Sequence, residues 1–141
     1  MKRQISGLRA ADRSIASETP DGLFLVRVQR VQFRRFVSKP YYNVWLAVIE
    51  PVRFTNHVLC SRIYCSPKAL WKLSWFLRDF GYDADSIDQD EVNENQLVGL
   101  RGVVKVTHVV YDGIPLVRFD GFAPASHWGE LSPANLDAQA S

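Results

Sequence analysis

The order of the strand-like and helix-like segments constrains the fold of this 141-residue chain more than any other feature. Three segments have the alternation and the β-branched and aromatic residues of strands, and they cover residues 23–36, 41–50 and 54–64. A helix-like segment follows at residues 66–80, and two more strand-like segments follow at residues 99–111 and 114–122. We therefore expect a mainly β protein with one helix between its third and fourth strands.

The first strand changes the side of its apolar residues partway along. These residues alternate in one parity before the change and in the other parity after it: Phe24, Val26 and Val28, then Val31 and Phe33. One extra residue in a strand moves every later side chain to the opposite face. We therefore expect a bulge or bend near Gln29 and Arg30.

The second strand and the helix are delimited by proline, serine and glycine. Pro51 ends the strand, Ser66 followed by Pro67 is a typical helix start, and Gly81 is a typical helix end. Three sets of apolar residues share a core-facing parity or stripe: Tyr42, Val44, Leu46 and Val48 in the second strand, Leu59 and Ile63 in the third, and Leu70, Leu73, Leu77 and Phe80 in the helix. The Asp-Gly pair at residues 112–113 predicts a tight hairpin turn between the last two strands.

Composition and length indicate one folded domain with an arm and a tail. With 47% apolar residues the chain is too apolar to be disordered, and it has no apolar run of the roughly 20 residues that span a bilayer. Residues 1–20 are expected to form a mobile basic arm, residues 21–128 the domain and residues 129–141 a mobile tail. Two cysteines form no disulfide framework, and the basic start is followed by no secretory apolar stretch, so we expect a soluble cytoplasmic protein without a membrane partner.

Three strands, one helix and two strands are the order of an OB-fold, a small barrel with its helix between the third and fourth strands. A long, bent first strand fits this fold because it has to serve both halves of the barrel. We therefore expect a five-stranded OB-fold barrel with one α-helix between strands 3 and 4. An SH3-like barrel, which usually lacks the long helix, and an α+β sandwich are the alternatives.

The net charge of +2 conceals a strong asymmetry along the chain. Residues 1–40 carry nine Lys and Arg against three acids, and residues 41–81 carry five against two. Residues 82–98 carry six acids and no Lys or Arg. This separation indicates a basic surface that faces a polyanion and an acidic surface kept away from it, with ordinary surface charge as the alternative.

The sequence offers little for catalysis, a metal or a cofactor. His57, Cys60 and Cys65 are close in sequence, but an extended chain points residues five apart to opposite sides, so we expect two thiols rather than a zinc site. The acidic segment at residues 83–94 fails the calcium-loop pattern, because an apolar residue occupies a ligand position and the glycine is absent. It is interpreted as a solvated loop. We therefore expect a protein that is not an enzyme and has neither a metal nor a cofactor.

Basic and aromatic residues gather in the first three strands and in the turns between them. Proteins that bind single-stranded nucleic acid combine cations that follow the phosphates with aromatic rings that stack on bases. The predicted binding residues are Arg27, Arg34, Arg35, Lys39, Tyr41, Trp45, Arg53, Phe54, Arg62 and Tyr64. Phe36 belongs to the same turn as Arg35. Tyr111 lies at the predicted turn between the fourth and fifth strands, where we expect it to close the nucleic-acid-binding groove from the other side. For any single ring, packing under a loop is an equal alternative, so the prediction depends on the set.

Trp71 and Trp75 lie on the flank of the predicted helix, away from its apolar stripe. Two exposed tryptophans would be unusual, so we expect residues 122–128 to fold back over them. The alternative is a surface for a protein partner or for a homo-oligomer.

Four stretches of the chain form a familiar pattern, at residues 39–51, 64–82, 97–104 and 116–122. The first joins Lys39-Pro-Tyr-Tyr to an apolar strand, and the second leads from Tyr64-Cys-Ser-Pro into the tryptophan-containing helix. Together they resemble the phage and prophage single-stranded-DNA-binding proteins with an OB-fold. The resemblance implies a protein that coats single-stranded DNA, with RNA as the other candidate polymer, in phage-type replication or recombination. Bacterial housekeeping single-strand-binding proteins recruit partners through an acidic C-terminal tip, whereas residues 137–141 contain one acid.

Overall fold

Strand β1 (Gly22–Arg34) organises the fold because it pairs with two different strands. The computed structural model describes residues 19–35 and 38–132. Its other elements are β2 (Tyr41–Glu50), the 3₁₀ turn η1 (Val52–Phe54), β3 (Val58–Tyr64), α2 (Leu70–Asp79), α3 (Ala84–Asp88), α4 (Glu94–Leu97), β4 (Arg101–Tyr111), β5 (Ile114–Pro124), the 3₁₀ turn η2 (Ala125–His127) and α5 (Trp128–Leu131). The protein is therefore mainly β, as the sequence predicts.

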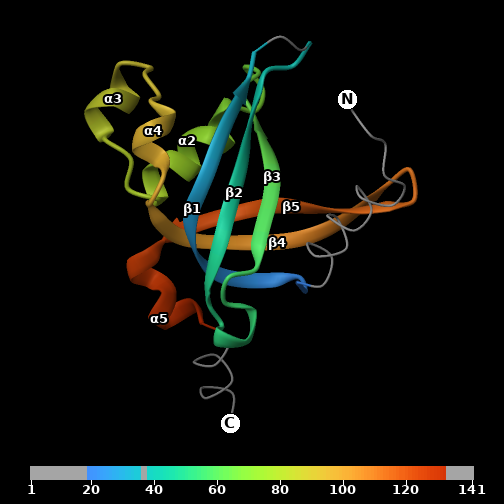
Figure 1. Ribbon diagram of the computed structural model, residues 1–141. Coiled ribbons are helices and arrows are strands. Elements are labelled where there is room, and N and C mark those ends of the chain that lie inside the picture. The colour runs from blue at the N-terminus through green and yellow to red at the C-terminus, as the bar shows by residue number, and fades with distance from the viewer. Residues whose placement is uncertain (1–18, 36–37, 133–141) are drawn as a thin grey trace, which may run out of the picture.

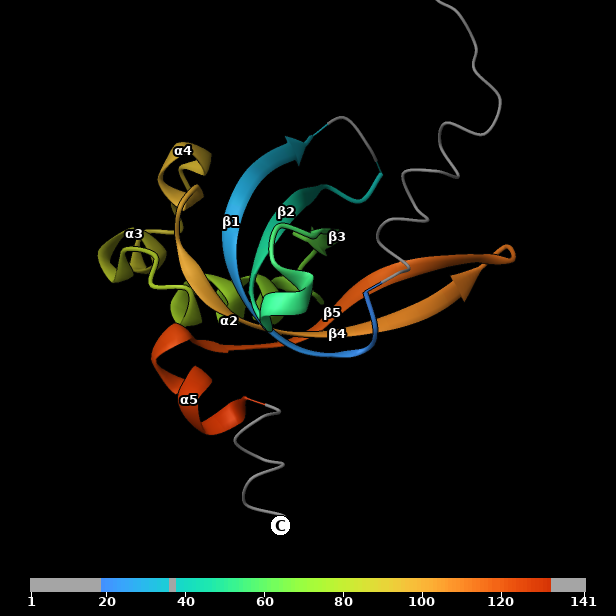
Figure 2. The same cartoon turned by 60° about the horizontal axis from the view of Figure 1, so that its bottom comes forward.

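The five strands form one antiparallel sheet in the order β3-β2-β1-β4-β5. The first part of β1, from Gly22 to Arg27, pairs with β4, whereas the pairing with β2 continues to Arg34. In Figure 1, β1, β2 and β3 run side by side while β4 and β5 cross them, and Figure 2 shows the curvature of β1 that joins the two parts. The bent first strand thus serves two halves of one sheet.

The predicted bulge in β1 is confirmed. Pairing with β2 passes from Val28 opposite Leu46 to Arg30 opposite Trp45, so Gln29 has no counterpart. Phe24, Val26 and Val28 before the bulge are buried, and Val31 after it packs against the same core. The extra residue therefore keeps the apolar side chains inward as far as Val31, whereas Phe33 near the end of the strand is 36% exposed and lies against the Tyr42 ring.

The five strands and the helix between strands 3 and 4 are present as predicted, but the structure differs from the predicted single-helix barrel in two respects. First, the sheet is not closed, because β3 and β5 are its two edges. These edges lie in contact, and α2 packs against both of them. Second, α3 and α4 replace the predicted acidic loop. The side chains of Asp83 and Asn93 accept hydrogen bonds from the backbone N–H groups of Asp85 and Asn95, and each of these caps begins a short helix.

Helix α2 begins later than predicted and ends where predicted. Its N-cap is Ala69 rather than Ser66, whose carbonyl accepts the Ala69 N–H in a preceding turn. At the other end, Gly81 has a φ of +83° and its N–H donates to Arg78, while the Tyr82 N–H donates to Leu77. These two bonds form the glycine-based helix end known as the Schellman motif.

The core lies between the inner face of β1–β2–β3, helix α2 and strands β4 and β5. The predicted inward residues of β2 and β3 are all buried, as are Leu73, Leu77 and Phe80 of the helix. Leu70 is the exception. It is 47% exposed because it lies in the first turn, and Phe76 is buried in the helix where the prediction had not placed a core residue.

The described chain extends beyond the predicted domain at both ends. Thr19, predicted within the mobile arm, is buried, and its hydroxyl is 3.2 Å from Nδ1 of His57. Residues 129–131, predicted within the mobile tail, belong to α5, and the indole N–H of buried Trp128 donates to the Glu50 carboxylate. Residues 1–18 of the predicted arm and 133–141 of the predicted tail lie outside the described residues.

Candidate nucleic-acid interface

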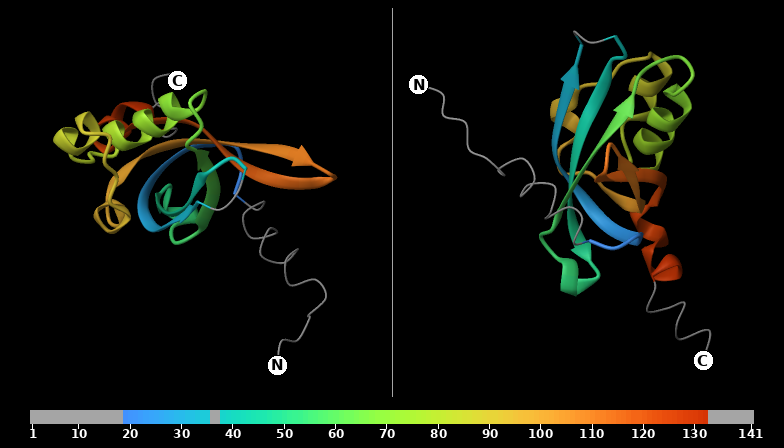
Figure 3. Two further views of the ribbon diagram at one scale, coloured as in Figure 1. Left: turned by 90° about the horizontal axis from the view of Figure 1, so that it is seen from above. Right: turned by 90° about the vertical axis from the view of Figure 1, so that its right-hand side faces the viewer.

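The face of β1–β2–β3 that points away from the core carries three rows of residues in register. The rows are Arg34–Tyr41–Tyr64, Gln32–Asn43–Arg62 and Arg30–Trp45–Cys60. We call these nine residues the outer face. The opposite side of the same strands packs against the core that α2 covers, and Figure 3 shows α2 on that side. The outer face is therefore turned away from α2.

Alternation along each strand explains why these side chains point outward. In β2, Val44 and Leu46 are buried, so Tyr41, Asn43 and Trp45 face the other way. In β1 the bulge at Gln29 changes which alternate residues face outward, and it thereby brings Arg30, Gln32 and Arg34 onto this face. The same bulge therefore keeps apolar side chains in the core and brings polar side chains onto the outer face.

The three strands of the outer face carry positive charges and almost no negative ones. Strands β1 and β3 contain no Asp or Glu, and β2 contains only Glu50 at its end. All arginines of the three strands are exposed, namely Arg27, Arg30, Arg34 and Arg62. Within residues 19–35 and 38–132, none of them forms a salt bridge with an acid. Their charges are free to act on an anionic ligand in solution.

Arginines and aromatic rings contact one another on this face. The Arg62 guanidinium carbon lies 4.4 Å from the ring centroid of Tyr41, and its Nη1 donates to the Tyr64 hydroxyl at 3.5 Å. That hydrogen bond is the main reason that the pKa of Arg62 lies above its ordinary value. Arg30 covers Trp45 in the same way, at 4.7 Å. Two cation–π pairs thus occupy adjacent parts of the face.

The structure brings half of the predicted binding residues together. Five of the ten belong to the outer face: Arg34, Tyr41, Trp45, Arg62 and Tyr64. Arg27 lies on the same side of β1, on the far side of the bulge. Arg35 and Lys39 are exposed in the connection next to Tyr41, whereas Phe36 lies outside the described residues.

Arg53 and Phe54 lie apart from this group. They belong to η1, beyond the end of β2, whereas Tyr41 begins that ten-residue strand. At about 3.4 Å per residue, the strand separates its two ends by roughly 30 Å. Phe54 also packs against Phe24 of the core, with ring centroids 5.8 Å apart, and Arg53 lies over its ring at 4.8 Å. The strand prediction missed this placement because residues 52–54 form a 3₁₀ turn.

Sequence reasoning overlooked Arg30, Gln32 and Asn43. The signal was available for the first two, because the predicted change of parity in β1 moves them to the same side as Arg27. Only the register between β1 and β2, however, places Arg30 opposite Trp45. Asn43 shares the parity of Tyr41 and Trp45.

The predicted cover over Trp71 and Trp75 forms only in part. Trp71 is 62% exposed and stacks on Trp75, with ring centroids 6.2 Å apart. Trp75 leans edge-on against Phe122 at 5.7 Å, so β5 covers it from one side. Trp128 does not reach the pair, because its indole is bonded to Glu50. The prediction is therefore wrong for Trp71.

The β4–β5 hairpin extends past the rest of the sheet. Its pairing with β1 ends at Val106, whereas the two strands continue to a turn at Asp112 and Gly113, both with positive φ, as the Asp-Gly signal predicts. Figures 1 and 2 show this ribbon projecting from the body of the protein. Val110 and Tyr111 near its tip are 74% and 69% exposed.

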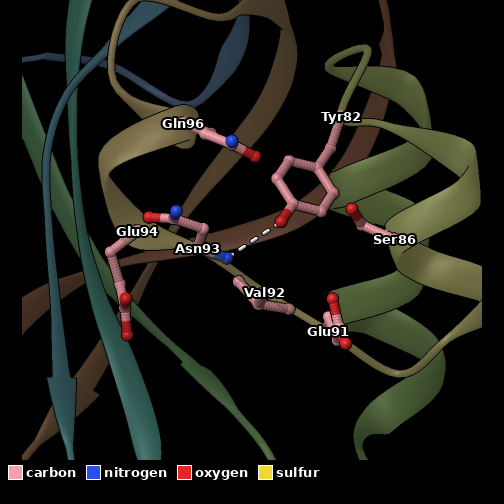
Figure 4. Close-up of a pocket in the computed structure, with 7 residues that line it drawn as sticks. All are labelled: Tyr82, Ser86, Glu91, Val92, Asn93, Glu94 and Gln96. Carbon is pink, nitrogen blue, oxygen red and sulfur yellow. Dashed lines mark hydrogen bonds between the residues drawn. The ribbon is translucent and has the colours of Figure 1, made fainter.

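A cavity of about 480 Å³ lies elsewhere, between α3 and α4 (Figure 4). Its lining includes Glu91 and Glu94, and the hydroxyl of Tyr82 accepts the backbone N–H of Asn93 there at 2.8 Å. Two carboxylates would repel phosphates, so this cavity does not suit a nucleic acid. Among the described residues, no three His, Cys, Asp or Glu side chains gather where they could hold a metal ion. The same residues include no helix long and apolar enough to cross a membrane.

No protein-family model matches the sequence, and a search of curated proteins finds no match either.

Proposed function

We propose that this chain is a non-enzymatic OB-fold protein that binds single-stranded nucleic acid, DNA before RNA, without strong sequence preference. The resemblance described above suggests a cytoplasmic role in phage-type replication or recombination. The observation that carries the proposal is the outer face, where exposed arginines and aromatic rings share three strands whose only acid is Glu50.

The sheet supports the OB-fold part of the proposal. A first strand shared between β2 and β4, a helix between the third and fourth strands, and edges β3 and β5 in contact are the features of a partly open five-stranded barrel. In such barrels the face of strands 2 and 3 binds oligonucleotides. The outer face occupies the corresponding strands.

The chemistry of the face suits an unpaired strand better than a duplex. Phosphates would meet Arg27, Arg34, Arg35, Lys39 and Arg62, with Arg53 at the far end of β2, while bases would stack on Tyr41, Trp45 and Tyr64. Phe54 is the weakest of the predicted rings because it already packs against Phe24 and Arg53. Rings can reach bases only where the bases are unstacked, which is the state of a single strand.

A titration of intrinsic tryptophan fluorescence with oligo-dT at two salt concentrations tests the proposal. We expect emission to change on binding, because Trp45 lies within the face. Neutralising about four phosphates should give a slope of log affinity against log salt near −3, at about −0.7 per phosphate for single strands. Unchanged emission together with no salt-sensitive binding would reject the proposed function.

The stacked pair of Trp71 and Trp75 favours a second candidate function, an OB-fold module that docks a protein partner or a second copy through α2. Its supporting observation is the 62% exposure of Trp71. Light scattering of the full chain and of Trp71→Ala tests this candidate. A larger species that Trp71→Ala converts to monomer would support it, and a monomer in both cases would count against self-association.

A further inference from the structure

The four arginines of strands β1 and β3, three of them within the outer face and Arg27 next to it, fall into two classes. Arg30 and Arg62 lie over aromatic rings, with their guanidinium carbons 4.7 Å and 4.4 Å from the ring centroids of Trp45 and Tyr41. Arg27 and Arg34 lie on the same side of β1, but no ring lies beneath either of them in the described part of the chain. All four are exposed and carry the same charge.

This difference matters because a guanidinium over a ring occupies the surface that an incoming base would use. The base has to displace the arginine or lie on it. A guanidinium is planar and stacks on aromatic rings and on bases alike, whereas a lysine ammonium is a compact charge that offers no flat surface. Stacking on the guanidinium keeps the existing cation–π contact, while displacement loses it.

We propose that Arg30 and Arg62 are stacking platforms, on which a base lies against the guanidinium with Trp45 or Tyr41 beneath it. This inference rests on the proposed function and deepens it, since it divides the cations into those that meet bases and those that meet phosphates. Arg30 becomes a binding residue that the sequence prediction lacked. Arg62, predicted to meet a phosphate, acquires a different role.

The surroundings of both residues fit the platform role. Arg30 pairs directly with Trp45 across β1 and β2, so the two side chains rise from the same row. Arg62 is held over Tyr41 by its hydrogen bond to the Tyr64 hydroxyl, and the Tyr64 ring lies 5.5 Å from that of Tyr41. Neither arginine forms a salt bridge with an acid among the described residues that could draw it off its ring.

Charge-preserving substitutions separate stacking from simple attraction. The four variants are Arg30→Lys, Arg62→Lys, Arg27→Lys and Arg34→Lys, each titrated with oligo-dT at several salt concentrations. We expect Arg30→Lys and Arg62→Lys to weaken binding by about five- to tenfold, and Arg27→Lys and Arg34→Lys to weaken it clearly less, because a lysine keeps the charge that a phosphate needs but offers no flat surface to a base. The salt slope should stay the same in all four, because the number of charges is unchanged.

Two results would overturn the inference. If all four variants bind as the unmodified chain does, the arginines act only as charges. If all four are weakened equally, the guanidinium is needed for phosphates in general and the rings beneath Arg30 and Arg62 are irrelevant. Thermal melts of the four variants check that folding is preserved. Absence of binding by the unmodified chain is a separate result, which would reject the proposed function itself.

Discussion

Phe80 packs directly over Gly102 of β4, and this contact shows how closely single residues fit in the core. A Cβ atom at position 102 would lie 2.4 Å from the Cδ1 and Cε1 atoms of the Phe80 ring. The ring is 3% exposed and is packed against Phe76 and Phe122, so it has little room to move. Glycine is therefore required here for space rather than for its backbone conformation.

We predict that Gly102→Ala destabilises the protein by about 1–3 kcal/mol, because overpacking forces Phe80 off its position. Urea unfolding followed by circular dichroism measures the change. Gly129→Ala is the matched control, since nothing lies within 4 Å of a Cβ at that position. Equal stability of Gly102→Ala and the unmodified chain would show that the ring adjusts freely.

At the scale of the element, the bulge in β1 has two effects at once. It lets Val28 and Val31 face one core although they differ in parity, and it brings Arg30 and Arg34 to the outer face. In a strand of the same sequence without the bulge, Val28 and Val31 would point to opposite faces, so one of them would leave the core. The core and the candidate site therefore depend on the same extra residue.

Deletion of Gln29 should destabilise the protein by about 1–3 kcal/mol, because it removes the bulge that bends β1 between β2 and β4, while Val28, Arg30 and Val31 would still alternate between the core and the outer face. The control is Gln29→Ala, which keeps the residue count and removes only an exposed side chain, so its change should stay within about 0.5 kcal/mol. Both are measured by chemical denaturation. A deletion variant as stable as the unmodified chain would show that β1 bends between its two partner strands without the bulge.

At the scale of the whole molecule, the outer face and the acidic helix α3 lie on different sides, whereas α4 contacts β1. The outer face faces away from α2, whereas the acidic helix α3 packs against α2. A sheet and a helix layer separate by about 10 Å, which exceeds the screening length of roughly 8 Å at physiological salt. Charges of α3 should therefore have little influence on a ligand at the outer face.

Two triple variants test this separation of charge. Arg27→Gln with Arg34→Gln and Arg35→Gln should weaken oligo-dT binding more than tenfold and reduce the salt slope by about 2, because three cations are lost. The variant with Asp88→Asn, Asp90→Asn and Glu91→Gln should change the affinity by less than about twofold at physiological salt. A large gain in affinity from the acidic variant would place those residues near the bound strand.

Much of this architecture could be predicted from the sequence because it depends on neighbouring residues. Alternation along β2 identifies Tyr42, Val44, Leu46 and Val48 as core residues, and the change of parity in β1 identifies the bulge. Gly81 and the Asp-Gly pair at residues 112–113 mark a helix end and a turn through local backbone conformation. Each of these signals lies within a few residues of the feature it predicts.

Only the tertiary structure decided the features that join distant segments. It placed Arg30 opposite Trp45, left β3 and β5 as unpaired edges, exposed Leu70 and Trp71, and bonded Trp128 to Glu50. The physical reason is that alternation determines which side of a strand a residue occupies but not which residue of another strand lies opposite. That choice depends on register, bending and packing over the whole molecule, which no short stretch of sequence contains.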